Sequence, residues 1–223
     1  MDCPSTIGKS RRVLTLYFSL EEEMATSEST RSSSRTLVQL DDPSAAKFLW
    51  GDVRLSWLWL IIRIYVGYQW LMAGYEKITS PVWFGSQAGT ALTGFIKGAL
   101  AKTTGANPAV QGWYAGFLNN MVLPNVALWS RFVAIGETLV GIGLILGIFT
   151  GIAAFFGGFM NVNYLFAGTV STNPLLFVFA TWLVLAWKTA GWLGLDHWIL
   201  PALGTPWAPG KIFANKNNPK TGS

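Results

Sequence analysis

The sequence predicts an all-α integral membrane protein, a four-helix up-down bundle with a long interfacial loop between the first and second spans. Of its 223 residues, 51% are hydrophobic and 12% are charged, against about 25% charged in a typical soluble domain. Residues 1–54 hold seven of the 16 Lys and Arg and eight of the 11 Asp and Glu. The remainder carries little charge and contains four apolar stretches of about 20 residues, the length that a helix needs to cross a bilayer.

The first segment, 1–45, is expected to be a disordered polar tail. Its run 27–34 contains five serines and little that can enter a core. A short apolar run, 13–20, follows three basic residues, but three glutamates come directly after it, so a cleaved signal peptide is not favoured. Whether Met1 or Met24 is the true start stays open.

The four spans are expected at about 55–78, 126–148, 150–170 and 174–195. The links between the last three spans are only a few residues long, which forces antiparallel neighbours and gives an up-down bundle. The transmembrane domain is therefore expected to cover 46–200, followed by a polar C-terminal tail, 201–223.

The connection 79–125 is too long for a simple link. Apolar residues recur at helical spacing in 91–100 and again in 110–122, and both segments are too short to span. We expect two interfacial helices at one mouth of the bundle, separated by a turn near 105–108. The alternative is an ordinary ordered loop.

The distribution of Lys and Arg predicts the orientation. Four spans place both termini on one side, where most of the basic residues lie, so the positive-inside rule favours cytoplasmic termini. The expected location is a bacterial or archaeal cell membrane, with membrane lipid as the first partner.

Cysteine and histidine are scarce enough to exclude several kinds of site. Cys3 is the only cysteine and His197 the only histidine, so one chain cannot form a disulfide, a cysteine-ligated iron–sulfur cluster or a bis-histidine haem. A zinc site of Cys and His is excluded too, and no other metal is expected. The sequence has no Gly-rich phosphate loop, so it does not indicate a nucleotide partner. It has no basic patch with interleaved aromatics, so it does not indicate a nucleic-acid partner. A redox role would need a diffusible organic cofactor, such as a quinone, or a partner subunit.

Two charges inside the apolar spans are the candidate catalytic residues, Arg63 and Glu137. A charge at mid-helix costs about 2.5–3.5 kcal/mol to insert, and the two residues fall at similar depth if the spans are aligned by their ends. We therefore expect an Arg63–Glu137 ion pair. The alternative role for such a pair is purely structural. A weaker pair, Glu76 with Arg131, is expected near the outer rim.

The candidate cofactor-binding residues are Trp70, Asn161 and Tyr164. In the first span, large rings, glycines and cations share one helical face, formed by Trp59, Arg63, Gly67, Trp70, Gly74 and Lys77. In the third span, Asn161 and Tyr164 share a stripe with glycines. An amide in a membrane must find a partner, so Asn161 is either a bond between helices or a donor to a quinone carbonyl. His197 is interpreted as a surface residue.

Several motifs together resemble the DoxX family of membrane proteins. They are RIYVGYQWLMAGYEKI in the first span, GETLVGIGLILGIFTGIAA across the second and third, NVNYLFAG in the third, and AGWLGLDHWI after the fourth. Together, and in this order, the motifs extend over about 55–200. The long loop containing Trp resembles most the DoxD branch, the membrane subunit of thiosulfate:quinone oxidoreductase. The resemblance implies a four-helix subunit linked to sulfur or thiol redox chemistry and a quinone pool.

The leading hypothesis is a membrane subunit of a quinone-linked oxidoreductase, with a quinone bound among Arg63, Glu137, Trp70, Asn161 and Tyr164. It implies a second oxidoreductase subunit or a homo-oligomer as a further partner. Two alternatives stay open: a non-enzymatic membrane scaffold that recruits a redox partner, and a small-solute carrier.

Overall fold

The computed structural model describes residues 42–204, and no strand occurs in this range. All described residues except Asp42 belong to one unit, which begins at Pro43. The prediction of an all-α fold is confirmed for these residues. The predictions for 1–41, including the start at Met24, and for 205–223 lie outside the described residues.

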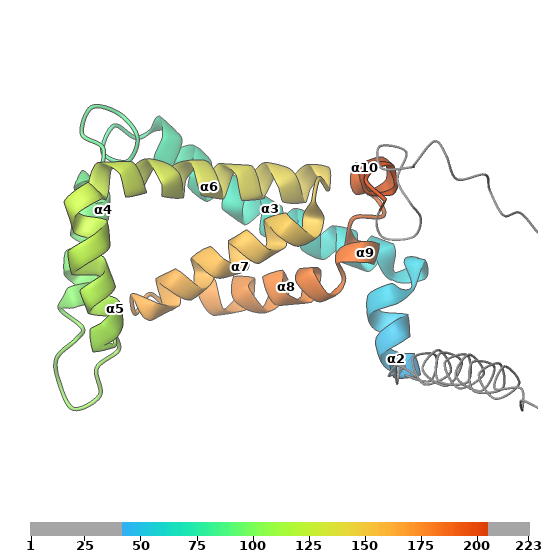
Figure 1. The fold of residues 1–223 in the computed structure, drawn as a ribbon, viewed down its shortest axis with the longest axis horizontal. Coiled ribbons are helices and arrows are strands. Elements are labelled where there is room, and N and C mark those ends of the chain that lie inside the picture. Colours follow the sequence, from blue (N-terminus) through green and yellow to red (C-terminus); the bar gives the residue numbers. More distant parts are fainter. Residues whose placement is uncertain (1–41, 205–223) are drawn as a thin grey trace, which may run out of the picture. The chain divides into compact units, whose positions relative to one another are not determined.

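This unit opens with short helical turns and then a long helix (Figure 1). The turns are α2 (Ser44–Ala46), the π-helical η1 (Lys47–Gly51) and the 3₁₀ turn η2 (Val53–Leu55). Helix α3 (Ser56–Thr79) follows, within one residue of each expected end of the first span. Its buried residues include Trp59, Arg63, Gly67, Trp70 and Gly74, which confirms the predicted inner face.

Both helices predicted in the long connection are present. They are α4 (Thr90–Leu100) and α5 (Gly112–Phe117), the latter continued by η3 (Leu118–Val122) and η4 (Leu123–Asn125). Their apolar sides form a separate small core, whose buried residues are Leu92, Ile96, Ala99, Val110, Tyr114, Leu118, Val122 and Ala167. Pro124 lies in η4 and has no N–H to donate, so the regular helix is interrupted there. Figure 1 shows the chain changing direction between α5 and α6.

The remaining helices are α6 (Val126–Leu146), α7 (Thr150–Phe166), α8 (Asn173–Leu185), α9 (Trp187–Ala190) and α10 (Asp196–Ala202). Helix α6 matches the second expected span, and α7 is shorter than the third. The expectation that the fourth runs to residue 195 is wrong. Ala186 departs from helical geometry (φ −88°, ψ 15°), and after α9 the chain turns through a glycine-rich stretch into α10.

Helices α3, α6, α7 and α8 pack on one another: α3 on α6, α6 on α7, α7 on α8, and α8 again on α3. The side chains between them form the main core, which includes Trp59, Val66, Trp70, Leu144, Ala154 and Leu183. Helices α6 and α7 are joined by a tight turn at Gly147, whose φ of 68° suits glycine. From this turn the two helices diverge toward α4 and α5 (Figure 1).

Glycines fix the register between α3 and α6. A Cβ atom on Gly141 would lie 2.5 Å from the backbone nitrogen of Leu71, and one on Gly67 would lie 2.9 Å from the Cβ of Leu144. Gly74 meets the backbone of Thr138 in the same way. The two backbones approach so closely that only glycine fits at these points.

We expect Gly141→Ala to destabilise the protein by about 1–3 kcal/mol, because the added methyl overlaps the backbone of α3. Gly98 in α4 is the matched control, because a Cβ there meets nothing within 4 Å. Gly98→Ala should be neutral or stabilising by up to about 1 kcal/mol through helix propensity. Thermal unfolding in detergent, followed by the helical circular dichroism signal, measures both. Equal melting temperatures for the two variants would contradict the close α3–α6 contact.

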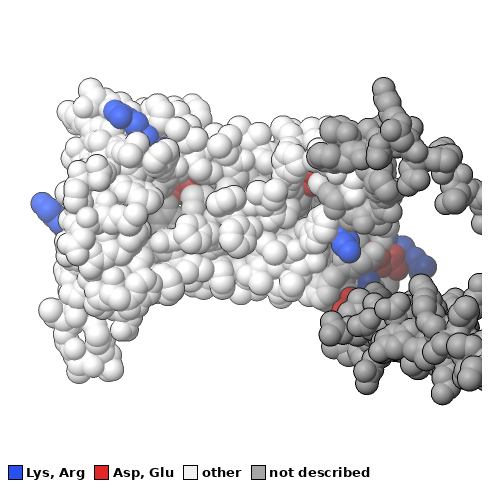
Figure 2. Space-filling view, viewed as in Figure 1, with Lys and Arg blue, Asp and Glu red and all other residues white. Residues whose placement is uncertain are grey.

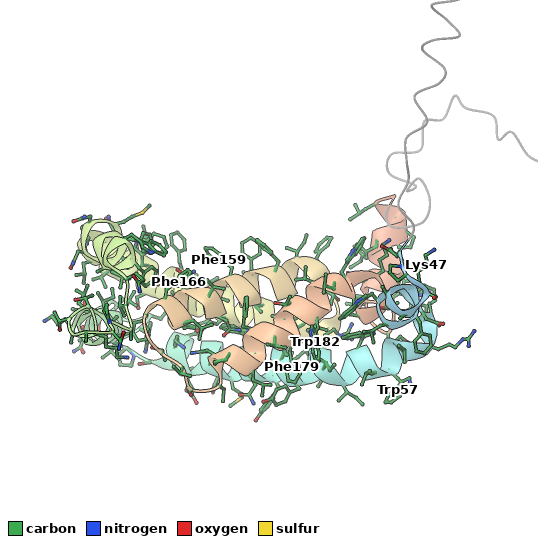
Figure 3. The ribbon with its side chains drawn as sticks, turned by 90° about the horizontal axis from the view of Figure 1, so that it is seen from below. Lys47, Trp57, Phe159, Phe166, Phe179 and Trp182 are labelled. Atoms are coloured by element: carbon green, nitrogen blue, oxygen red, sulfur yellow. The ribbon has the colours of Figure 1, made fainter. Side chains whose placement is uncertain are left out.

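Many large apolar side chains lie at the surface of the long helices, while two acidic side chains are buried. Large apolar side chains are exposed along the long helices, for example Ile61 (59%), Leu139 (62%) and Phe159 (57%), whereas Glu137 and Asp196 are 1% and 2% exposed. Figure 3 shows Phe159, Phe166 and Trp182 at the surface of the helices. In Figure 2, Lys and Arg lie toward the two ends of the helices, and two small acidic patches are recessed in the wide uncharged band between.

By length and composition, one helical stretch among the described residues, Gly112–Leu146, is long and apolar enough to cross a membrane. Helix α8 is apolar but shorter than that criterion requires. The stretch includes the bend before α6.

Candidate functional site

Glu137 connects three helices. It lies on α6 and is 1% exposed. Its Oε2 atom is 2.7 Å from Nζ of Lys77 on α3, and its Oε1 atom accepts a hydrogen bond from the hydroxyl of Tyr164 on α7. A buried carboxylate is stable only when it is paired and hydrogen-bonded, and these two contacts provide both conditions.

Lys77 reaches this carboxylate from the last turn of α3 while keeping part of its surface in contact with the outside. Its side chain is 18% exposed, and Nζ lies 5.1 Å from the ring centre of Trp83, a favourable cation–π distance. Sequence reasoning placed Lys77 on the correct face of the first span but gave it no partner.

The predicted Arg63–Glu137 pair is wrong. Arg63 is buried, but its Nη1 donates to the carbonyl oxygen of Ala190 at 2.9 Å and its Nη2 to that of Leu193 at 3.0 Å. The reason is the register: Gly67 lies against Leu144, so Arg63 lies beside the α6–α7 turn. Alignment of the spans by their ends misplaced α6 by roughly eight residues, or about 12 Å.

Asp196 completes the site around Arg63. Its carboxylate accepts hydrogen bonds from the backbone nitrogens of Phe149 (2.6 Å) and Thr150 (2.8 Å), and so caps the N-terminus of α7, where a negative charge is favoured. Its charge also acts on Arg63. A Cβ atom on Gly147 or Gly194 would overlap Nη1 of Arg63. These groups join α3, α7 and the α9–α10 turn, which supports the structural role considered for Arg63.

Sequence reasoning missed Asp196. One signal was available: Asp196 is one of only three acidic residues after position 54, with Glu76 and Glu137. An acid that remains in so apolar a sequence is expected to have a specific partner. The partner itself, the start of a helix 46 residues earlier, is a tertiary contact.

The three candidate cofactor-binding residues lie close together around α7. The ring of Trp70 stacks on that of Tyr164, with 6.5 Å between centroids and 23° between planes. A Cβ on Gly157 would lie 3.0 Å from Nε1 of Trp70. Trp70 Nε1 and both side-chain polar atoms of Asn161 are buried and have no hydrogen-bond partner among the described residues.

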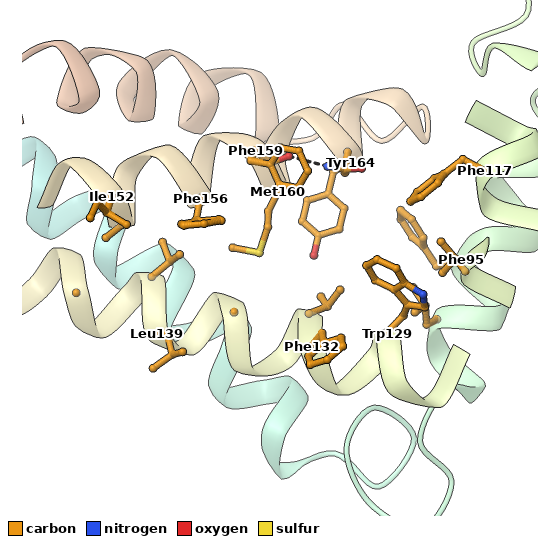
Figure 4. A pocket seen from close by; sticks show the side chains of 18 of the residues that line it. Phe95, Phe117, Trp129, Phe132, Leu139, Ile152, Phe156, Phe159, Met160 and Tyr164 are labelled. Atoms are coloured by element: carbon orange, nitrogen blue, oxygen red, sulfur yellow. Dashed lines mark hydrogen bonds between the residues drawn. The ribbon is translucent and has the colours of Figure 1, made fainter. Parts of the chain in front are cut away.

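A cavity of about 850 Å³ opens where α6 and α7 diverge. In Figure 4, Tyr164 points from α7 into this space toward α6. The lining is mainly apolar and aromatic and includes Phe95, Phe117, Trp129, Phe132, Leu139, Ile152, Phe156, Phe159 and Met160. Helices α4 and α5 close one end of the cavity. Of the predicted site residues only Tyr164 lines it; Trp70, which stacks on Tyr164, and Asn161 are buried and do not line it.

Few polar groups line the cavity besides Tyr164, and two of them, the side chains of Tyr114 and Asn163, already make hydrogen bonds. The hydroxyl of Tyr114 donates to the carbonyl oxygen of Asn163 at 2.9 Å, and Nδ2 of Asn163 donates to the carbonyl oxygen of Phe159 at 2.8 Å. The hydroxyl of Tyr164 differs from these because it is joined to an ionisable pair, Glu137 and Lys77. The cavity wall thus has one point at which a ligand can exchange a proton with the protein.

The other predicted contacts are not formed. Glu76 and Arg131 are exposed, and no ion pair joins them among residues 42–204. His197 is half-buried rather than fully at the surface, between the rings of Trp192 and Trp198 at 4.5 and 5.3 Å. In the same part of the chain, no group of three or more His, Cys, Asp or Glu side chains gathers that would hold a metal ion.

Comparison with known protein families finds a match. The model of the DoxX family matches residues 58–169, which is half of the chain and includes Arg63, Lys77, Glu137 and Tyr164. No curated protein matches the chain, and no solved structure matches it.

Proposed function

We propose a function from the premise that this chain belongs to the DoxX family, which is generally a family of membrane proteins. The chain acts as the membrane subunit of a quinone-linked oxidoreductase and binds the quinone in the cavity between α6 and α7. The observation that carries this proposal is the Tyr164 hydroxyl, which lines an apolar cavity and is hydrogen-bonded to a buried, ion-paired carboxylate.

The exposed apolar side chains support a position within the bilayer. At 1.5 Å per residue, α3 and α6 measure about 36 and 31 Å, and α7 about 26 Å, close to the roughly 30 Å of a hydrocarbon core. Helix α8 reaches a comparable length together with α9. We infer that all four cross the membrane, with α4 and α5 at one face and both termini at the other, cytoplasmic face.

The residues present fit a quinone. Its apolar tail would lie along the aromatic and aliphatic side chains of the cavity, and cavities of this size hold drug-sized ligands. Its carbonyl oxygens need hydrogen-bond donors, and the Tyr164 hydroxyl, which here donates its one hydrogen to Glu137, provides one when Glu137 is protonated. When bound, a quinone supplies two-electron redox chemistry that consumes two protons. Behind that tyrosine, Lys77 holds exchangeable protons and the Glu137 carboxylate can accept one.

The electron donor is a reduced sulfur compound, thiosulfate or a thiol, delivered by a partner subunit. The alternatives fit the site less well. A carrier for small polar solutes would need a polar path, whereas the cavity wall is almost wholly apolar. A scaffold would need the ion pair of Glu137 only to join its helices, and would not need the apolar cavity beside it.

We expect Tyr164→Phe to weaken quinone binding about fivefold, the effect of one lost hydrogen bond of about 1 kcal/mol. Tyr68→Phe is the matched control, because Tyr68 is 55% exposed on α3 and does not line the cavity. Quenching of tryptophan fluorescence by a short-chain quinone measures binding, since Trp129 is in the cavity wall. Lipids extracted from the purified protein show whether it retains a quinone. Thiosulfate-dependent quinone reduction by the purified protein tests the activity.

Wild-type protein that neither retains nor binds a quinone would refute the proposal. Equal affinities for wild-type, Tyr164→Phe and Tyr68→Phe would place the quinone elsewhere.

A further inference from the structure

The contacts of Glu137 form a chain that runs from the cavity to the surface. The Tyr164 hydroxyl is in the cavity wall and donates to Oε1 of Glu137. The other carboxylate oxygen is 2.7 Å from Lys77 Nζ, and the Lys77 side chain is 18% exposed. Each neighbouring pair is within hydrogen-bond distance, so a proton can pass along the three groups.

The surface that this chain reaches is at one end of the helices only. Lys77 is in the last turn of α3, beside Trp83 in the segment that leads to α4. Toward the other end, fully buried apolar side chains from three helices, Val66, Leu144 and Ala154, fill the core. The next charged group in that direction, Arg63, is 14 residues from Lys77 along α3, or about 21 Å. Helices α7 and α8 contain no charged residue.

We propose that Lys77, Glu137 and Tyr164 form a proton relay that serves the cavity from the end of the bundle that carries α4 and α5, opposite the described chain ends. The purpose of this relay, which is quinone reduction by a reduced sulfur compound, rests on the proposed function. Tyr164 gives its hydroxyl proton to the ligand's carbonyl oxygen and takes one from Glu137, which takes one from Lys77. Lys77 then takes a proton from water, so one proton moves and the relay returns to its initial state.

The hydrogen-bond direction gives the relay its order. The Tyr164 hydroxyl has one hydrogen and here donates it to Glu137. A proton transferred from Lys77 arrives on Oε2 of Glu137, and a turn of the carboxyl group then lets this O–H donate to Tyr164, which leaves the phenol hydrogen for the ligand. The other titratable groups that act on the relay are Glu76, on Glu137, and Tyr114, on Tyr164.

The test measures the protonation of Glu137 from each side of a membrane without any quinone. The full chain is placed in sealed vesicles, and an antibody to a C-terminal tag reads the orientation. Infrared spectra follow the carboxyl band while the outer pH is stepped, and subtraction of Glu137→Gln spectra isolates Glu137. The band should respond when the end with α4 and α5 faces outward and not when the termini do. A response from the termini side, or from neither side, would overturn the relay.

Lys77→Arg separates a relay from a structural ion pair. Arginine keeps the charge beside Glu137 but does not give up its proton, so the variant should fold like the wild type. Its carboxyl band should respond to the outer pH about tenfold more slowly or worse. A response as fast as that of the wild type would overturn the role of Lys77. Since no quinone is present, a failure of quinone binding leaves these outcomes unchanged and refutes the proposed function alone.

Discussion

Arg63→Met is expected to lower the free energy of unfolding by about 3–5 kcal/mol, the usual cost of removing one partner from a buried charged network. Arg63 is 1% exposed and bonds the carbonyl oxygens of Ala190 and Leu193. Its loss leaves both carbonyls unsatisfied and leaves Asp196 buried without a positive charge nearby. Methionine retains much of the packing volume, so the loss reports on polar contacts rather than on a cavity.

The double variant Arg63→Met/Asp196→Asn should be less damaging than the two single losses added together, because no unpaired charge remains. The matched control is Arg54→Met. That side chain is 85% exposed and makes only a 3.6 Å ion pair with Asp52, so its melting temperature should stay near that of the wild type. Thermal unfolding in detergent gives all four values. Strict additivity would show that Arg63 and Asp196 do not act on each other.

The positions of the main helices could be predicted because they depend on local composition. Apolar runs separated by glycine and proline located α3 and α6 to within about two residues. The end of the fourth helix was placed too late, although residues 186–195 contain Lys188, Gly191 and Gly194 and are less apolar than the helix before them. Their turn is held by Arg63, which donates to Ala190 and Leu193 from a helix far away in the sequence, so the contact that fixes the turn is not a local one.

Within the site, the face of each helix could be predicted, but the partners could not. Helical periodicity placed Trp70 and Lys77 on one buried side of α3 and Tyr164 on the inner side of α7. The register between α3 and α6 does not follow from the periodicity of either helix. It is set by backbone contact at Gly67, Gly74 and Gly141, and it decides whether Arg63 or Lys77, 14 residues apart on α3, lies beside Glu137.

The cavity was beyond sequence reasoning for the same reason. It exists because α6 and α7 diverge from their tight turn, and because α4 and α5 close the wider end (Figure 1). The sequence indicated two helices in the connection between the first two spans, and the structure shows their apolar sides packed on each other and on Ala167 after α7. The angle between two helices depends on side chains from both, which no single segment encodes.

Lys77→Met is expected to be as damaging as Arg63→Met, at about 3–5 kcal/mol, and more damaging than Glu137→Gln. The asymmetry follows from burial. Without Lys77, the Glu137 carboxylate is left at 1% exposure with only the Tyr164 hydroxyl as a partner. Without the charge on Glu137, the Lys77 ammonium group can extend to water, because its side chain already reaches the surface. Glutamine also retains an acceptor for Tyr164, so Glu137→Gln should cost only about 1 kcal/mol.

The double variant Lys77→Met/Glu137→Gln should recover most of the stability lost in Lys77→Met, because it contains neither charge and keeps the bond to Tyr164. Lys97→Met, at an exposed position on α4, controls for the loss of a lysine as such and should melt like the wild type. Thermal unfolding in detergent measures the series. If Glu137→Gln proves more damaging than Lys77→Met, then Lys77 does not reach water as the structure indicates, and the surface end of the proton relay is lost with it.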